Sequence, residues 1–142
     1  MKNKIGMLFL SMLLALACMG AFSLLKSQSK PAIEILTKQD AGIKDFYIKN
    51  REVHIAAGIT VKNNTDDHIS FMLTAESQSD YESGLITSPL LLGYDEDFSA
   101  TVFNLQGKET KTFDVIFVGE HGDFNQKADR LIPQISATVV EN

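Results

Sequence analysis

The acidic run DEDFS at residues 95–99 is the nearest approach to a metal-binding motif in this 142-residue chain. Carboxylates spaced two residues apart at the start of a loop are ligands that calcium prefers. A helix-loop-helix calcium loop also needs Gly at its sixth position and Glu at its twelfth, where this chain has Ala100 and Gln106. The sequence therefore predicts no dedicated metal site. A looser calcium site made by Asp95, Asp97 and backbone carbonyls is the alternative to a solvated acidic loop.

Residues 120–123 (EHGD) bring an imidazole between two carboxylates. Zinc needs three or four such ligands that converge from different parts of the chain. The other histidines are His54, inside an alternating stretch, and His68, beside a turn, and nothing in the sequence places them near His121. We expect a surface turn built on Gly122.

The sequence contains few residues in arrangements that are suited to catalysis. The only cysteine is Cys18, inside the apolar N-terminal stretch, so the rest of the chain cannot use a thiol nucleophile. No serine lies in a G-x-S-x-G elbow. Paired carboxylates of the glycosidase type need a substrate cleft, for which a β domain of about 110 residues leaves little room. The sequence predicts a protein that is not an enzyme, with no catalytic residues and no cofactor.

The stretch YESGLITSPLLLGY at residues 81–94 is the least ordinary surface candidate. Tyrosine and apolar side chains on a loop can form a recognition patch for a protein or glycan partner. The candidate recognition residues are Tyr81, Leu90, Leu91, Leu92 and Tyr94. In the competing interpretation, Leu85, Ile86 and residues 90–92 belong to short strands or to loops that fill the core.

The N-terminal segment 1–26 predicts where the rest of the chain is delivered. Lys2 and Lys4 precede an uncharged run over residues 5–25, which ends at Lys26. An apolar run of about 20 residues is long enough to cross a bilayer as a helix. The positive-inside tendency keeps the short basic tail in the cytoplasm. We therefore expect a single-pass signal anchor in the cell membrane, with the C-terminal domain outside the cytoplasm.

Two other fates of this segment stay open. Ala15 and Ala17 form an A-x-A pattern that is typical of a cleavable secretory signal, which would release the protein. Residues 15–18 (ALAC) also resemble the box that precedes the acylated cysteine of bacterial lipoproteins. That resemblance implies lipidation at Cys18 and a lipid-anchored protein.

Composition limits the partners of the exported part. After removal of Lys2, Lys4 and Lys26, ten of the thirteen Lys and Arg remain against eighteen Asp and Glu, a net charge of −8. Nucleic acid and anionic lipid surfaces attract basic proteins, so neither is an expected partner of this domain. We expect a short polar linker at residues 27–31 and one domain over residues 32–142.

Alternation of apolar and polar residues dominates this domain. Residues 52–62 and 69–76 both alternate, with the turn-forming cluster at residues 63–68 between them. This pattern predicts two long strands paired as an antiparallel hairpin. Residues 98–105 and 111–118 predict a second pair, whose turn at residues 106–110 uses Gly107 for its backbone geometry.

Shorter strands are predicted at residues 32–38, 44–49 and 135–140, and one helical turn at residues 124–130. About seven short strands with turns between them are typical of an all-β antiparallel sandwich. One N-terminal hydrophobic helix precedes this sandwich.

A family resemblance rests on three stretches: VKNNTD at residues 61–66, FNL at residues 103–105, and residues 107–117. Together they resemble the immunoglobulin-like domains of small bacterial membrane-anchored surface proteins and lipoproteins. The resemblance covers about residues 53–118 and implies an immunoglobulin-like β-sandwich outside the cytoplasm. The chain has no Trp and no Cys pair, unlike antibody domains.

Three functions follow as hypotheses. The first is a membrane-tethered extracytoplasmic binding module for a protein or glycan. The second is an accessory subunit of a membrane complex, whose anchor helix packs against other helices through its small residues. The third is a small lipoprotein acylated at Cys18.

Overall fold

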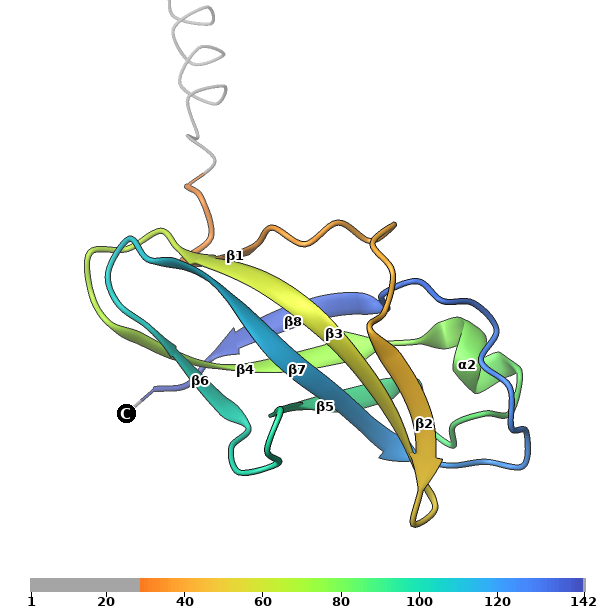
Figure 1. Ribbon diagram of the computed structural model, residues 1–142. Coiled ribbons are helices and arrows are strands. Elements are labelled where there is room, and N and C mark those ends of the chain that lie inside the picture. The colour runs from red at the N-terminus through yellow and green to blue at the C-terminus, as the bar shows by residue number, and fades with distance from the viewer. Residues whose placement is uncertain (1–28, 142) are drawn as a thin grey trace, which may run out of the picture. The chain divides into compact units, whose positions relative to one another are not determined.

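Antiparallel strands dominate the computed structural model, which describes residues 29–141 (Figure 1). The predicted anchor and Cys18 lie outside the described residues. In the described part, one short helix, α2 (Gln78–Glu82), accompanies eight strands: β1 (Ile33–Ile35), β2 (Asp45–Lys49), β3 (Glu52–Asn63), β4 (Ile69–Glu76), β5 (Leu90–Asp95), β6 (Val102–Leu105), β7 (Thr110–Glu120) and β8 (Gln134–Val139). The all-β, antiparallel fold class is confirmed.

The strands form one continuous sheet that folds back on itself. Its order is β1-β3-β7-β5-β4-β6, with β2 also pairing with β3 and β8 also pairing with β4. Strand β5 joins the two layers, because its first half pairs with β4 and its second half with β7. On the opposite side β1 lies beside β8, and among the described residues no ladder joins them. The result is a nearly closed barrel, in which β3 and β7 cross in front of β8 and β4 (Figure 1).

Both predicted hairpins are wrong. Strand β3 pairs with β1, β2 and β7, whereas β4 pairs with β5, β6 and β8. The segment at residues 64–68 therefore carries the chain from one layer to the other. The second predicted pair separates in the same way, since β6 pairs with β4 and β7 pairs with β3. The alternation of apolar and polar residues determines which face of a strand is buried, but it does not determine which other strand pairs with it.

The two interlayer connections lie side by side and are joined by hydrogen bonds. The fully buried Asn63 donates from its side-chain amide to the carbonyls of Asp67 (2.7 Å) and Gln106 (3.0 Å). The Lys108 backbone N–H donates to the Thr65 carbonyl at 2.9 Å. The expectation that Gly107 supplies an unusual backbone angle is wrong, because Lys108 has the positive φ of 61°.

Strand positions agree with the predicted periodicity, with three corrections. Strands β3, β4 and β7 are confirmed. Strand β6 begins at Val102, because residues 96–101 form a loop, and β5 is an additional strand. The helical turn predicted at residues 124–130 is wrong, since backbone N–H groups there donate to other segments, as Phe124 does to the Gly84 carbonyl. The helix lies at Gln78–Glu82 instead, where the Ser77 hydroxyl donates to the Asp80 carboxylate.

The core lies between the two layers and takes the inward-facing residues of each strand. Its fully buried large side chains are Val53, Ile55, Ile59, Val61, Phe71, Leu73, Leu85, Ile86, Leu91, Leu105, Val115 and Phe117. Burial of each such side chain contributes about 1.5–3 kcal/mol. From Pro31 onward this core belongs to one compact unit.

Candidate functional site

An apolar and aromatic set covers the outer surface of β2, β3, β7 and β5, opposite the core. Strand register aligns Tyr47 with His54, His54 with Val118, and Val118 with Leu92. In the next row Tyr94 lies opposite Ile116. With Phe98 of the following loop, these residues form what we call the outer aromatic face: Tyr47, His54, Leu92, Tyr94, Phe98, Ile116 and Val118.

Aromatic stacking organises this face. The Tyr47 and His54 rings are nearly parallel, 9° apart, with centroids separated by 4.6 Å. The Phe98 ring stands edge-on to His54 at 5.4 Å and lies 6.0 Å from the ring of Tyr94. His54 is only 5% exposed, whereas Phe98 is 45% exposed. Offset and edge-to-face pairs of this kind contribute about 0.5–1.5 kcal/mol each beyond their burial.

The loop after β5 holds Phe98 in a conformation that a bulky residue rarely adopts. Its φ is 57°, in the left-handed region that favours glycine. The Asp95 carboxylate fixes the loop by accepting the Ser99 hydroxyl (2.5 Å) and the backbone N–H groups of Ser99 (2.7 Å) and Ala100 (3.1 Å). These bonds, above all that from the Ser99 side chain, lower the pKa of Asp95. An ionised carboxylate thus stabilises the conformation that presents Phe98.

His54 has an unusual environment for a polar side chain. Both ring nitrogens are buried, and neither has a hydrogen-bond partner among the described residues. The nearest acidic oxygen, Oε2 of Glu52, is 3.4 Å from Nε2. Most buried polar groups in native proteins are paired, so an unpaired one requires an explanation such as a functional role. Because His54 lies under Phe98, the outer aromatic face is the candidate for that role.

The structure divides the residues of the predicted recognition stretch. Leu92 and Tyr94 are half-buried on the outer aromatic face. Leu90, 60% exposed, points to the same side at the start of β5. Leu91 is fully buried and belongs to the core, and Tyr81 is 44% exposed on α2. The competing interpretation holds for Leu85, Ile86 and Leu91, which are core residues, and for residues 90–92, which lie in the short strand β5.

The sequence alone does not group Tyr47, His54 and Phe98 with the predicted recognition stretch at residues 81–94. They lie on a short strand, a long strand and a loop, and long-range pairing brings them together. One signal was available in the sequence: His54 on the outward side of an alternating strand, with an aromatic residue on the short strand before it.

The candidate metal residues do not gather into a site. Asp95 uses its carboxylate within its own loop, as described, and Asp97 is exposed. His121 lies 3.2 Å from the Phe124 carbonyl through Nε2, and the Glu120 carboxylate accepts the Thr87 hydroxyl. Within residues 29–141 no three His, Cys, Asp or Glu side chains are placed to hold a metal ion together.

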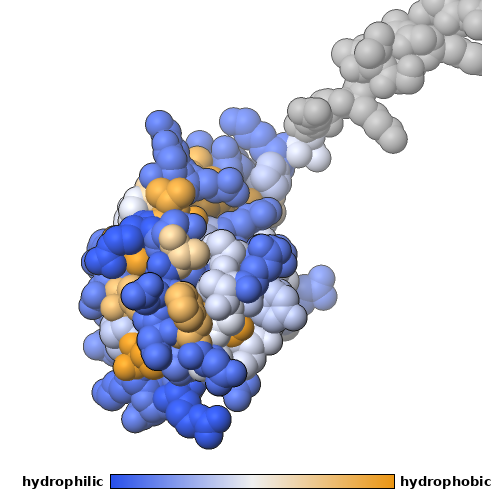
Figure 2. Space-filling model, turned by 90° about the vertical axis from the view of Figure 1, so that its right-hand side faces the viewer, coloured by the Kyte–Doolittle hydropathy of each residue, from blue (hydrophilic) through white to orange (hydrophobic). Residues whose placement is uncertain are grey.

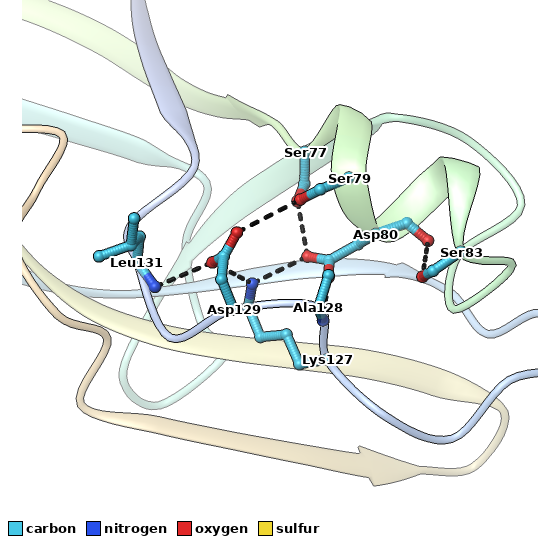
Figure 3. Close-up of polar contacts among 8 residues, drawn as sticks. All are labelled: Ser77, Ser79, Asp80, Ser83, Lys127, Ala128, Asp129 and Leu131. Atoms are coloured by element: carbon cyan, nitrogen blue, oxygen red, sulfur yellow. Dashed lines mark hydrogen bonds and ion pairs between the residues drawn. The ribbon is translucent and has the colours of Figure 1, made fainter.

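A second polar constellation joins α2 to the segment before β8 (Figure 3). The fully buried carboxylate of Asp80 lies 3.0 Å from the ammonium of Lys127, whose side chain is 4% exposed. The same carboxylate accepts the Ser77 hydroxyl at 2.6 Å and the Ala128 N–H at 3.3 Å. A buried ion pair is tolerated when hydrogen bonds satisfy its remaining atoms. We interpret the pair as the bond that docks α2 at this end of the barrel.

Asp129 extends the constellation to the surface. Burial by itself raises the pKa of Asp129, but the Leu131 N–H at 2.9 Å and the Lys127 ammonium at 3.3 Å lower it below its ordinary value. Asp129 therefore remains ionised and shares Lys127 with Asp80. In Figure 2 this end of the domain is mostly hydrophilic, with small separate apolar patches.

Comparisons with protein-family models, curated proteins and solved structures give no match for this chain. In the part of the chain that the structure describes, no helix is long and apolar enough to span a membrane.

Proposed function

We propose that the domain is a non-enzymatic binding module that holds a protein partner on the outer aromatic face. The supporting observation is Phe98, a large side chain that stays 45% exposed at φ 57°. Backbone strain at an exposed residue costs stability, and such residues cluster at functional sites. Aromatic side chains are enriched where protein partners bind.

The remaining residues of the face support the same function. Leu92, Ile116 and Val118 are half-buried, so a partner could still cover apolar surface there. Contiguous exposed apolar surface is a feature of interaction sites. Neither ring nitrogen of His54 accepts or donates a hydrogen bond within residues 29–141, so a bound partner could supply one if Phe98 moves.

We further propose that residues 1–26 anchor this module in the cell membrane, with the domain outside the cytoplasm and related to immunoglobulin-like surface domains. Support comes from the length of the apolar run and from its flanking lysines. The intact mass of the native protein tests the anchor. A full-length mass is expected, and a mass for residues 18–142 plus acyl chains would instead establish lipidation at Cys18.

Affinity enrichment from native membranes tests the binding surface. We expect Phe98→Ser to reduce recovery of the partner at least about tenfold, the effect of losing 1.4 kcal/mol at a hot spot. Val139→Ser is the matched control, since Val139 is also 45% exposed but lies on β8 in the other layer. Equal recovery with both variants would refute the proposed surface. Recovery of a glycan in place of a protein would change the class of partner.

A further inference from the structure

A groove beside α2 is distinct from the outer aromatic face. It has a volume of about 450 Å³, which lies in the range of ligand pockets. Its apolar side is formed by Leu131, Ile132 and Pro133. Glutamine side chains line it from three segments of the chain: Gln39, Gln78 and Gln134.

The groove has an uncompensated negative charge. Three carboxylates line it, those of Asp40, Glu76 and Asp129. The one cation among its lining residues is Lys127, whose charge is balanced by the buried Asp80 behind it. Among the described residues no basic side chain forms an ion pair with Asp40 or Glu76. A ligand that complements this groove is therefore cationic.

The shape of the groove and its surroundings indicates a ligand larger than a small ion. A second hollow of about 220 Å³ shares Gln39, Ile132 and Pro133 with the groove and is otherwise lined by Ile35, Thr37, Ile135 and the basic Lys38, so the negative charge is confined to the groove itself. The second hollow lies where β1 and β8 are side by side, since Ile35 belongs to β1 and Ile135 to β8, and within residues 29–141 no ladder joins these two strands. Because both hollows are lined by Gln39, Ile132 and Pro133, an extended segment in the groove could reach the second hollow.

We propose that this groove binds an extended peptide segment of a partner through an arginine side chain. The aliphatic stem of arginine would lie on Leu131 and Pro133, while its guanidinium reaches the carboxylates. Arginine fits better than lysine, because its planar fork binds carboxylates in bidentate fashion. The groove is thus a second interaction surface, selective for a basic residue.

The test is an NMR titration of the full-length chain in detergent micelles. The probe is the capped peptide Val-Arg-Val-Thr, and its control is the same peptide with citrulline, an uncharged isostere, in place of arginine. We expect the arginine peptide to shift the amide signals of Gln78, Leu131 and Gln134 saturably, with a Kd of about 1 mM or tighter. The citrulline peptide should bind about tenfold more weakly, because it lacks the charge-assisted hydrogen bonds.

Variants locate the binding site. The double variant Asp40→Asn/Glu76→Gln should weaken the arginine peptide about fivefold or more, and both residues are exposed, so the fold is retained. Asp67→Asn is the charge control, because Asp67 is exposed on the connection between β3 and β4, away from α2 (Figure 1). Equal binding of the two peptides, equal weakening by Asp67→Asn, or no saturable shift would each overturn the proposal.

Discussion

At the scale of single residues, the backbone conformation of Phe98 lowers the stability of the loop, whereas the carboxylate of Asp95 raises it. The left-handed backbone at Phe98 costs about 1–2 kcal/mol for a residue with a Cβ atom. The Asp95 carboxylate offsets this cost with three hydrogen bonds to the end of the same loop. Glycine would relieve the strain, yet the chain has a phenylalanine that packs on His54 and remains half-exposed.

This balance predicts an order of stability among variants of Phe98. Phe98→Ala keeps the strain and loses the packing, whereas Phe98→Gly loses the packing and removes the strain. We expect the glycine variant to be more stable than the alanine variant by about 1 kcal/mol. Urea denaturation measures the difference in the free energy of unfolding. An alanine variant at least as stable as the glycine variant would show that the loop is unstrained.

The Asp95 loop predicts a pH response. Its folded pKa lies below the ordinary 3.8, mainly through the Ser99 hydroxyl. A lowered folded pKa means that the contribution to stability is present above about pH 3.8 and is lost as the pH falls through the folded value. Ser99→Ala should raise the pKa of Asp95 toward 3.8 in an NMR titration of side-chain carboxyl signals. The pKa of Asp129 serves as the control and should not move.

At the scale of elements, α2 depends on one buried ion pair. Lys127→Met leaves the Asp80 carboxylate buried without its cation, which we expect to cost about 3–5 kcal/mol. The double variant Lys127→Met/Asp80→Leu removes both charges and should recover most of that loss. Thermal and urea unfolding of the wild type, Lys127→Met, Asp80→Leu and the double variant measure the coupling. Additive losses in the double variant would contradict a direct pair.

The variant Lys127→Met should also change the pKa of Asp129. Burial raises the pKa of this carboxyl, and Lys127 is one of the groups that oppose it. Without the ammonium, the pKa of Asp129 should rise toward its ordinary 3.8, so the stability that its ionised form contributes, which is lost as the pH falls from about 3.8 through the folded pKa, becomes smaller. A carboxyl titration at an unchanged pH would show that the Leu131 N–H and the Ser79 hydroxyl lower the pKa without help from Lys127.

The paired connections depend on Asn63. Besides its two donated bonds, its side-chain oxygen accepts the backbone N–H and the hydroxyl of Thr65. Asn63→Ala leaves buried partners unsatisfied and should cost about 3 kcal/mol in urea denaturation. Asn125→Ala, at an exposed loop position, should change stability by less than about 0.5 kcal/mol. Similar losses for both would remove the structural role assigned to Asn63.

The periodicity of the sequence predicted the positions of the strands better than it predicted which strands pair with one another. The alternation in β3 and β7 agrees with the burial of Ile55 and Val115 on the core face. It could not show that the turn-forming residues after Asn63 cross between layers, because the same residue types also make hairpins. The decisive contacts are the bonds between residues 63–68 and 106–109, which join segments about forty residues apart.

At the scale of the whole molecule, the candidate site was predicted in part. Leu92 and Tyr94 came from local composition, because apolar residues and tyrosine are unusual in a loop. Tyr47 and His54 joined them only through the antiparallel pairing of β2 with β3 and of β3 with β7. The α2 constellation was not predicted, since Asp80 and Lys127 are far apart in sequence and each resembles an ordinary surface charge.

Two surfaces of different chemistry thus occupy one small domain. The outer aromatic face lies on β2, β3, β7 and β5, and the acidic groove lies beside α2. The charge of −8 after residue 26 is compatible with a partner that brings both apolar and basic side chains. Binding through both surfaces should weaken at high salt, because the acidic groove contributes through charge.

Site-specific photocrosslinking in native membranes tests the central claim most directly. A photoreactive phenylalanine analogue at position 98 is compared with the same analogue at Thr138, an exposed position on β8. We predict one discrete crosslinked protein from position 98, which Tyr94→Ser strongly reduces, and none from position 138. Equal crosslinking from both positions, or a product from position 98 that Tyr94→Ser leaves unchanged, would contradict the outer aromatic face as the binding surface.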